Sequence, residues 1–281
     1  MAGTQHSGAR RGSAPRPAAR GAEGVAPEVI RAAREIADRL AQERAEAVVL
    51  VGSRVRGDVH DHSDVDLIAV GRGPARRLEV HEPFVVSVQW RTPAQLREGF
   101  ADLADLSPIP GWRRAVIVYD PKKIAAGLKR EALAWAWDAL GARADAWVAE
   151  QVTDYAEEVF KLVGSLRAAR YSAAAVQRSA LAMKLPRVMA VHRRTLYDGD
   201  AQLHEAIVAG MGEPWRRAHR RTLGVQAETL EQTCGAALEL YALAAEETKQ
   251  LLDERQFAVV RGACTAAGFP IGRTPRSKRL I

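Results

Sequence analysis

One run constrains this chain more than any other: residues 52–66 read Gly-Ser-Arg-Val-Arg-Gly-Asp-Val-His-Asp-His-Ser-Asp-Val-Asp. It follows the apolar residues 47–51, which are typical of a buried strand, so the Gly-Ser pair is expected to turn the chain sharply into a short helix. Asp64 and Asp66 then open a second apolar segment. Because side chains alternate along a strand, the two carboxylates are predicted to point to the same side.

Each part of this pattern suits a nucleoside triphosphate. Backbone N–H groups at a helix start can hold phosphate oxygens, and the Ser53 hydroxyl can add a contact. Two neighbouring carboxylates are costly to bury alone, but they form a natural ligand pair for a Mg²⁺ ion that carries phosphates. The sequence therefore predicts a magnesium site at Asp64 and Asp66. The residues predicted to bind the nucleotide are Gly52, Ser53, Arg54 and Gly57.

Taken singly, these parts are common, since D-x-D and Gly-Ser occur by chance in many loops. Their order is much more specific. A strand, Gly-Ser, a second glycine four residues on, and D-x-D opening another strand together resemble the signature of the DNA polymerase beta-like nucleotidyltransferase superfamily. The resemblance implies an α+β fold whose nucleotidyltransferase domain has a mixed sheet.

The rest of the chain divides into an α/β part and a helical part. Apolar residues at helical spacing predict a helix at about 27–44, and apolar or alternating runs predict strands near 78–80, 84–90 and 115–119. From residue 122 onward, good helix formers dominate. We expect three regions: a disordered basic tail (1–24), the nucleotidyltransferase domain (25–120) and an all-α helical bundle (121–281). The helices predicted in the bundle span about 124–137, 142–170, 172–194, 200–210, 214–222 and 225–252.

The formal charge of +7 is concentrated at the ends of the chain. Four arginines against one glutamate lie before residue 25, and four basic residues follow residue 272, which leaves the body near zero. A basic excess of this kind argues against a duplex-binding face, so a nucleic-acid partner is not expected. No apolar run approaches the ~20 residues of a bilayer span, and no signal peptide is evident. We therefore expect no membrane partner and a cytoplasmic location.

Because a predicted helical half follows the α/β part, the chain is similar to the kanamycin-type aminoglycoside nucleotidyltransferases, whose polymerase beta-like domain is followed by a helical bundle. The later stretches that look similar are 84–90, 156–160, 191–197 and 277–280. The resemblance implies transfer of a nucleoside monophosphate from a Mg²⁺-bound triphosphate, ATP foremost, to a hydroxyl of a small-molecule acceptor, with release of pyrophosphate. It also implies a homodimer whose active site draws bundle residues from the partner chain.

Three positions depart from the family pattern. At the position of the family's third metal-binding carboxylate, this chain has Ser87. At the position of a phosphate-binding lysine of the family, it has Ser165. The resemblance also implies a carboxylate base four residues beyond the position matched to Glu157. This chain has Lys161 there, and a lysine accepts no proton at neutral pH unless its pKa is strongly depressed. Glu157 is therefore retained with Asp64 and Asp66 as a catalytic candidate. Other side chains that could substitute for the missing groups are Glu79, Glu82, Glu158 and Gln89, while His60 and His62 are expected at the surface.

Three functions stay open at this stage. The first is the nucleotidyltransferase, for which an aminoglycoside-like acceptor is one option, although the many arginines at 193–194 and 216–221 disfavour a polycation. The second is a nucleotide-holding regulator that kept Asp64 and Asp66 but lost turnover. The third is an RNA-directed role suggested by the spacing of Arg187 and His192, which a helix places on different faces.

Overall fold

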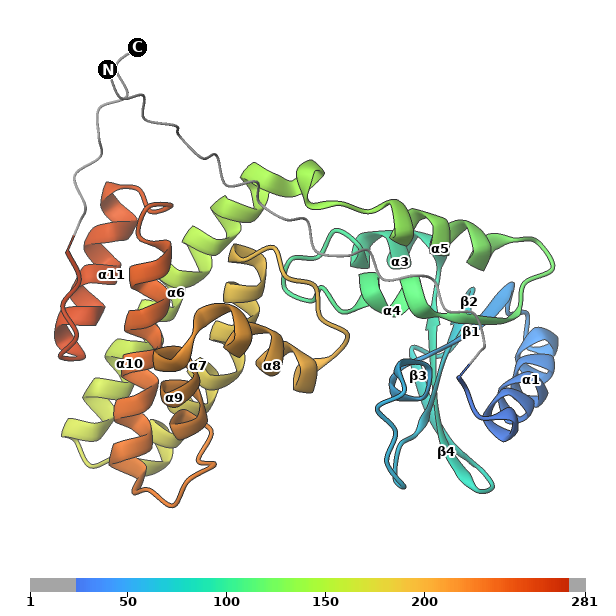
Figure 1. Ribbon diagram of the computed structural model, residues 1–281, viewed down its shortest axis with the longest axis horizontal. Helices are drawn as coiled ribbons and strands as arrows, with labels where there is room; N and C mark the ends of the chain where they lie inside the picture. The colour runs from blue at the N-terminus through green and yellow to red at the C-terminus, as the bar shows by residue number, and fades with distance from the viewer. Residues whose placement is uncertain (1–23, 273–281) are drawn as a thin grey trace, which may run out of the picture.

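The computed structural model describes residues 24–272 and arranges them as an α/β lobe and a helical lobe (Figure 1). Apart from residue 24, the predicted basic tail lies outside the described residues, as do residues 273–281. The α+β class predicted from the sequence is confirmed, with the mixed sheet first in the chain and the helices after it.

Five strands form one mixed sheet. Its order is β3 (Arg76–His81), β4 (Phe84–Arg91), β2 (Val65–Val70), β1 (Ala47–Val51) and β5 (Val116–Tyr119). The strands β2 and β4 run parallel, and every other neighbouring pair is antiparallel. The predicted strands are therefore confirmed, and the two strands that flank the Gly-Ser turn and the D-x-D pair lie at the centre of the sheet.

Alternating side chains give the sheet two covered faces. On one face, Val48, Leu50 and Leu67 pack against the helix α1 (Pro27–Gln42), whose buried residues recur at helical spacing. On the other face, Val49 and Val70 join a core with α3 (Pro93–Gly99), α4 (Pro108–Arg114) and α5 (Ile124–Ala134). Because Asp66 alternates with Leu67, it lies on the face that carries α4.

The helix α5 lies against the α/β lobe, although it belongs to the region that the sequence assigned to the bundle. Lys129 Nζ donates to the carbonyl of Ala115 at 2.7 Å, and Arg113 Nε donates to the carbonyl of Ala132 at 2.8 Å. These bonds join α5 to the end of α4, so the α/β lobe extends beyond residue 120.

The helical lobe is built around two long antiparallel helices, α6 (Gly141–Arg167) and α7 (Tyr171–His192). Around them lie the short 3₁₀ helix η1 (Trp137–Leu140) and the helices α8 (Asp200–Met211), α9 (Glu213–Thr222), α10 (Leu230–Thr248) and α11 (Glu254–Ala266). The Tyr241 hydroxyl of α10 donates to the carbonyl of Val152 on α6 at 2.9 Å inside this core. No helix within residues 24–272 is long and apolar enough to cross a membrane.

The two lobes contact each other through the loop between α7 and α8 and through the helices on either side of it. The backbone N–H of Leu106 donates to the Tyr197 hydroxyl at 3.3 Å, and Arg187 Nη1 donates to the carbonyl of Ala104 at 3.4 Å. On the far side of the loop, Gln202 donates to a carboxylate oxygen of Asp58 at 3.2 Å. The bundle therefore touches the α/β lobe next to the turn that carries the sequence motif.

Candidate nucleotide site

The Gly-Ser turn lies directly against the second carboxylate of the D-x-D pair. The last residue of β1, Val51, pairs with Asp66 of β2, so Gly52 leaves the sheet beside the Asp66 side chain. Gly52 has a φ of 82°, and a Cβ atom built on it would lie 2.2 Å from Asp66 Oδ2. Both the backbone conformation and this close approach require glycine at position 52.

The short helix α2 (Ser53–Arg56) follows the turn and ends at Gly57, whose φ is 91°. Arg54, predicted to bind the nucleotide, donates from Nε to the carbonyl of Asp64 at 3.1 Å and from Nη2 to the carbonyl of Ser63 at 2.5 Å. Its guanidinium also lies over the ring of Phe84. Arg54 therefore holds the start of the D-x-D segment against α2, so that the turn and the carboxylates keep a fixed relation.

Asp66 is an ionisable group in an unfavourable environment. Burial, followed by the neighbouring carboxylate of Asp64, raises its pKa to about 6, while Arg56 and Arg76 act in the opposite direction. Two close carboxylates, one of them partly desolvated, match the hard oxygen ligands that Mg²⁺ prefers. Among the described residues, no group of three or more His, Cys, Asp or Glu side chains is placed to hold a metal ion. Within the described part of the chain, Asp64 and Asp66 are the candidate donors for a cation at this turn.

Ser87 lies beside Asp66 on the neighbouring parallel strand, since the two residues are register partners of β4 and β2. Ser87 is 1% exposed, and its hydroxyl oxygen has no hydrogen-bond partner within the described part of the chain. A carboxylate at this position would adjoin Asp66, which is where the family resemblance expects the third metal ligand. The neutral side chain leaves that position without charge.

Three side chains near the sheet could substitute for the missing third carboxylate, and they point in different directions. Glu79 forms ion pairs with Arg39 of α1 and Arg77, on the face of the sheet opposite Asp66. Glu82 lies at the exposed turn between β3 and β4. Gln89, which follows Ser87 by two residues, lines the same cavity as Asp66. Of these three, only Gln89 faces the site, and it brings an amide instead of a charge.

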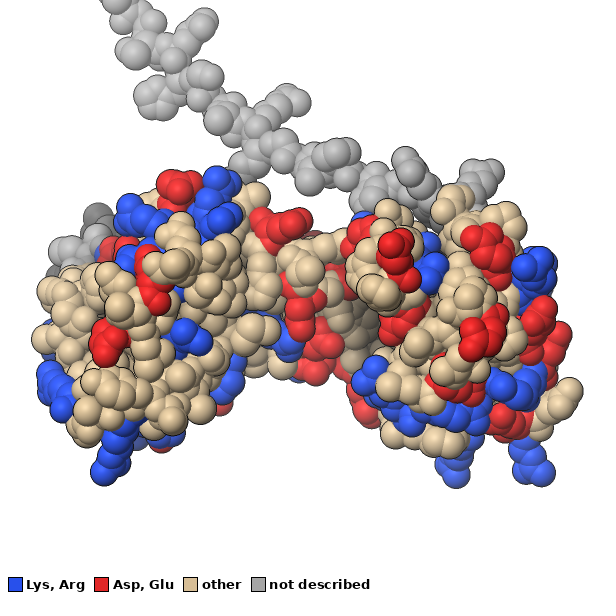
Figure 2. Space-filling model, turned by 90° about the horizontal axis from the view of Figure 1, so that it is seen from below, with Lys and Arg blue, Asp and Glu red and all other residues tan. Residues whose placement is uncertain are grey.

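A cavity of about 530 Å³ opens in front of Asp66 and extends beneath α3 and α4 to the junction of the lobes. Asp and Glu side chains surround the narrow waist between the lobes (Figure 2). The walls are mostly polar and come from both lobes. The cavity-lining polar residues, in chain order, are Arg56, Asp66, Gln89, Arg91, Gln95, Asp102, Asp105, Ser107, Arg114 and Asp198.

The residues predicted on the bundle side lie elsewhere. Glu157 and Lys161 form an i,i+4 ion pair of 2.8 Å on α6, with side-chain exposures of 72% and 47%, and neither lines the cavity. The hydrogen bond from Lys161 lowers the pKa of Glu157, and the same bond raises the pKa of Lys161. Lys161 therefore stays protonated at neutral pH and is unsuited to the role of a base within this chain.

Sequence reasoning missed the cavity residues Asp102, Asp105, Arg114 and Asp198. Asp198 precedes Gly199, a dipeptide that marks a turn, so a loop could have been expected there. Nothing local, however, indicates that this loop reaches a motif more than 130 residues earlier in the chain. The α4 helix was also unpredicted, and Arg114 stands at its end.

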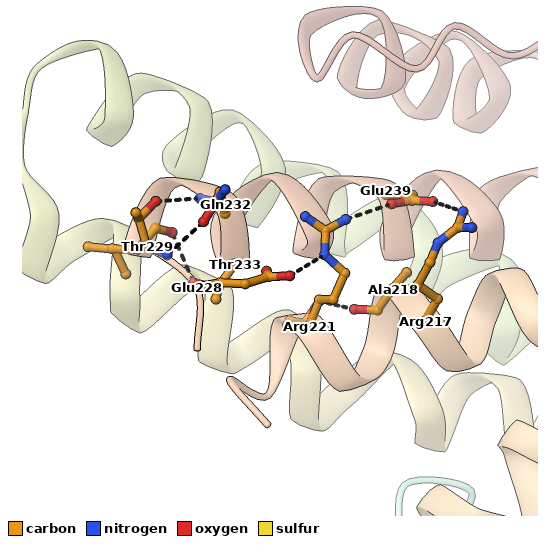
Figure 3. Close-up of polar contacts among 10 residues, drawn as sticks. Arg217, Ala218, Arg221, Glu228, Thr229, Gln232, Thr233 and Glu239 are labelled. Carbon is orange, nitrogen blue, oxygen red and sulfur yellow. Dashed lines mark hydrogen bonds and ion pairs between the residues drawn. The ribbon is translucent and has the colours of Figure 1, made fainter. Parts of the chain in front are cut away.

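Two arginines of α9, Arg217 and Arg221, are engaged within the bundle (Figure 3). Arg217 donates to Glu239 at 3.3 Å, and Arg221 donates to Glu228 at 2.8 Å while its Nη1 lies 3.8 Å from Glu239. These pairs bring the charges of α9 together with Glu239 of α10 and with Glu228, which precedes α10, so most of the arginine charge noted in the sequence is offset locally. The same holds for the pairs Arg193 with Glu247, Arg194 with Asp145 and Arg216 with Glu213.

Comparison with known proteins shows which family model the α/β lobe matches. Residues 30–134 match the family model described as a nucleotidyltransferase domain, a range that includes the Gly-Ser turn, both motif aspartates and α5. The α/β lobe is thus similar to a nucleotidyltransferase domain, and the helical lobe follows it.

Among solved structures, the chain is similar to the crystal structure of a nucleotidyltransferase-like protein from Exiguobacterium sibiricum 255-15 at 1.90 Å resolution. The identity is 15%, the match covers 79% of this chain and 77% of that chain, and the TM-score is 0.49. No curated protein matches the chain at a significant level.

Proposed function

We propose that this protein transfers a nucleoside monophosphate from a Mg²⁺-bound nucleoside triphosphate, ATP foremost, to a hydroxyl group of a small polar acceptor. The observation that carries the proposal is the contact between Gly52 and the Asp66 carboxylate at the mouth of the cavity. In this proposal, the turn that would bind phosphate lies next to the carboxylate that would hold the cation. The nucleotidyltransferase match over residues 30–134 supports the same chemistry.

The donor side is formed by residues 52–66. The turn from Gly52 to Gly57 receives the phosphates, with the Ser53 hydroxyl as an additional donor. Asp64 and Asp66 would hold the cation, which when bound supplies positive charge to the phosphate oxygens. The half-buried Asp66 is ionised above pH 6, because its pKa is raised only to about 6. The Asp66 carboxylate therefore carries charge at neutral pH.

The acceptor side is the polar part of the cavity beneath α3 and α4. Asp102 and Asp105 each use one carboxylate oxygen to accept a backbone N–H, from Ala104 at 2.9 Å and Ser107 at 3.0 Å. These bonds fix the two carboxylates at the cavity wall, where either can orient an acceptor hydroxyl and accept its proton. Because the bundle arginines are paired with acids, a cationic acceptor of the aminoglycoside type remains compatible with this cavity.

A second function, a nucleotide-holding regulator without turnover, is favoured by one specific observation. Ser87 stands where a third carboxylate would adjoin Asp66, and among the described residues only two carboxylates are left for the cation. An RNA-directed role has less support, because Arg187 pairs with Asp200 while His192 lies near Glu247. Arg187 and His192 thus contact different partners.

Pyrophosphate release separates the enzyme from the regulator. Wild-type protein is incubated with Mg-ATP and, in separate arms, with kanamycin A as a cationic acceptor or maltotriose as a neutral one. Pyrophosphate release that depends on the acceptor and disappears in Asp66→Asn supports the transferase. Comparison of release with kanamycin A and with maltotriose shows whether a cationic or a neutral acceptor is used. Tight Mg-ATP binding without release in any arm would favour the regulator instead.

A further inference from the structure

Two guanidinium groups meet around one aspartate at the boundary between the lobes. Arg56 Nη1 of α2 donates to the backbone carbonyl of Asp198 at 3.2 Å, and Arg114 of α4 forms an ion pair with Asp198 Oδ2. The Asp198 side chain is 9% exposed, and its other oxygen, Oδ1, is buried without a hydrogen-bond partner in the part of the chain that the structure describes. All three residues line the cavity that holds Asp66.

Each arginine of this cluster has one acidic partner, since Arg56 Nε pairs with Asp58 Oδ1 at 3.0 Å and Arg114 pairs with Asp198. Burial lowers the pKa of Arg114, and the charge of Arg56 lowers it further. A guanidinium carries five N–H donors in a flat fork, and the ion pair of Arg114 with Asp198 joins Nη1 to Oδ2. Two guanidinium groups that line a common cavity can donate to a polar anion bound there.

The phosphate chain of a nucleotide is the anion within reach. Arg56 links the cluster to the catalytic carboxylates, since it acts electrostatically on Asp66 and bonds directly to Asp198. Among the described residues that line the cavity, the basic ones are Arg56, Arg91 and Arg114. A cation for the outer phosphates is therefore sought among these three arginines.

We propose that Arg114 contacts the outer phosphates of the bound triphosphate and that Asp198, supplied by the α7–α8 loop, is the positioning residue that orients its guanidinium. The proposal rests on the proposed function, because it assigns a residue to the same nucleotide site. It places the leaving pyrophosphate at the boundary of the lobes, where α4 and the α7–α8 loop meet α2.

The test measures binding of ATP, pyrophosphate and AMP by isothermal titration calorimetry in the presence of Mg²⁺. Arg114→Gln keeps a hydrogen-bonding side chain and removes the charge, and Arg114→Lys restores the charge without the fork. The matched control is Arg97→Gln, which removes an exposed guanidinium of α3 that pairs with Glu131 outside the cavity. AMP lacks the outer phosphates, so its affinity reports whether the rest of the site has stayed intact.

Arg114→Gln is expected to weaken ATP and pyrophosphate about tenfold or more, to change AMP less than about twofold, and to be partly rescued in Arg114→Lys. Asp198→Ala combined with Arg114→Gln should weaken ATP no more than Arg114→Gln alone, because Asp198 acts through Arg114. ATP and pyrophosphate binding as tight in Arg114→Gln as in Arg97→Gln overturns the inference and leaves the proposed function standing. Absence of ATP binding in the wild type overturns both.

Discussion

Gly52 and Asp66 share a space that admits no additional atom. An alanine Cβ at position 52 would lie 2.2 Å from Asp66 Oδ2, on a backbone with φ 82° and ψ −163°. Gly212 is a matched control, because it has φ 80° and ψ −175° and a Cβ added there would meet nothing within 4 Å. Both alanine variants should lose about 1–3 kcal/mol of unfolding free energy through backbone strain. Only Gly52→Ala should also lose Mg-ATP affinity, as measured by calorimetry. Equal nucleotide affinity in the two variants would contradict the assigned role of Gly52.

Ser87 is the second residue whose substitution is informative. Ser87→Asp places a third carboxylate next to Asp66 on the parallel strand, so it should tighten Mg²⁺ use and raise the rate of pyrophosphate release. Without Mg²⁺ the same variant should unfold at lower urea, because three close carboxylates then repel one another in a buried position. Ser87→Asn is the uncharged control. A wild-type rate that is already fast and falls in Ser87→Asp would show that the third ligand lies elsewhere.

Local sequence pattern accounts for part of the site. Gly52, Asp64 and Asp66 could be predicted because a buried strand, a turn and a second strand are encoded within twenty residues of one another. Arg114 and Asp198 could not be predicted, because their meeting depends on how α4 and the α7–α8 loop pack. Tertiary packing of this kind leaves no periodic signal in the sequence.

Among the elements, α8 and α9 are joined by a pair of stacked histidines. The rings of His204 and His219 lie 4.6 Å apart at 19°, with His204 Nδ1 3.0 Å from His219 Nε2. Burial lowers the pKa of His219 to about 4, and the neighbouring His204 acts in the same direction. A histidine with a depressed folded-state pKa contributes stability above its unfolded pKa of about 6.5, and this stability is lost as the pH falls toward 4.

The pair therefore predicts a specific pH dependence. Between pH 7 and pH 4 the wild type should lose on the order of 3 kcal/mol more unfolding free energy than His219→Phe, which keeps a stacked ring but does not titrate. Urea denaturation of both proteins across this range measures the difference. Parallel pH profiles would mean that the pKa of His219 is the same in the folded and the unfolded protein.

The boundaries of elements were less predictable than their existence. The helix expected at 225–252 begins at Leu230, because the Thr229 side chain and Gln232 form a capping box there. The helix α11 was not expected, although Asp253 and Gln256 form the same kind of box. The short α4 also escaped prediction, since seven residues that begin Pro-Ile-Pro-Gly carry little helical periodicity.

At the scale of the whole molecule, the homodimer implied by the family resemblance remains a prediction. The bundle exposes large apolar side chains on α6 and α7, namely Phe160, Val176 and Met183, which are 47%, 63% and 43% exposed. We expect a dimer in light scattering at a protein concentration of tens of micromolar. Met183→Glu, on the exposed side of α7, should shift the protein toward monomer if this surface is shared. A strictly monomeric wild type at that concentration would contradict the prediction.

The central claim is that Asp64 and Asp66 hold a cation that brings a nucleoside triphosphate to the Gly-Ser turn. Isothermal titration of ATP, GTP, CTP and UTP, with and without Mg²⁺, tests it most directly. We predict Mg²⁺-dependent binding that weakens by at least ~1.5–3 kcal/mol in Asp64→Asn and in Asp66→Asn, by analogy with charged hydrogen bonds. Circular dichroism should show both variants folded. Triphosphate affinity that is unchanged in both variants, or that is independent of Mg²⁺ in the wild type, would contradict the account.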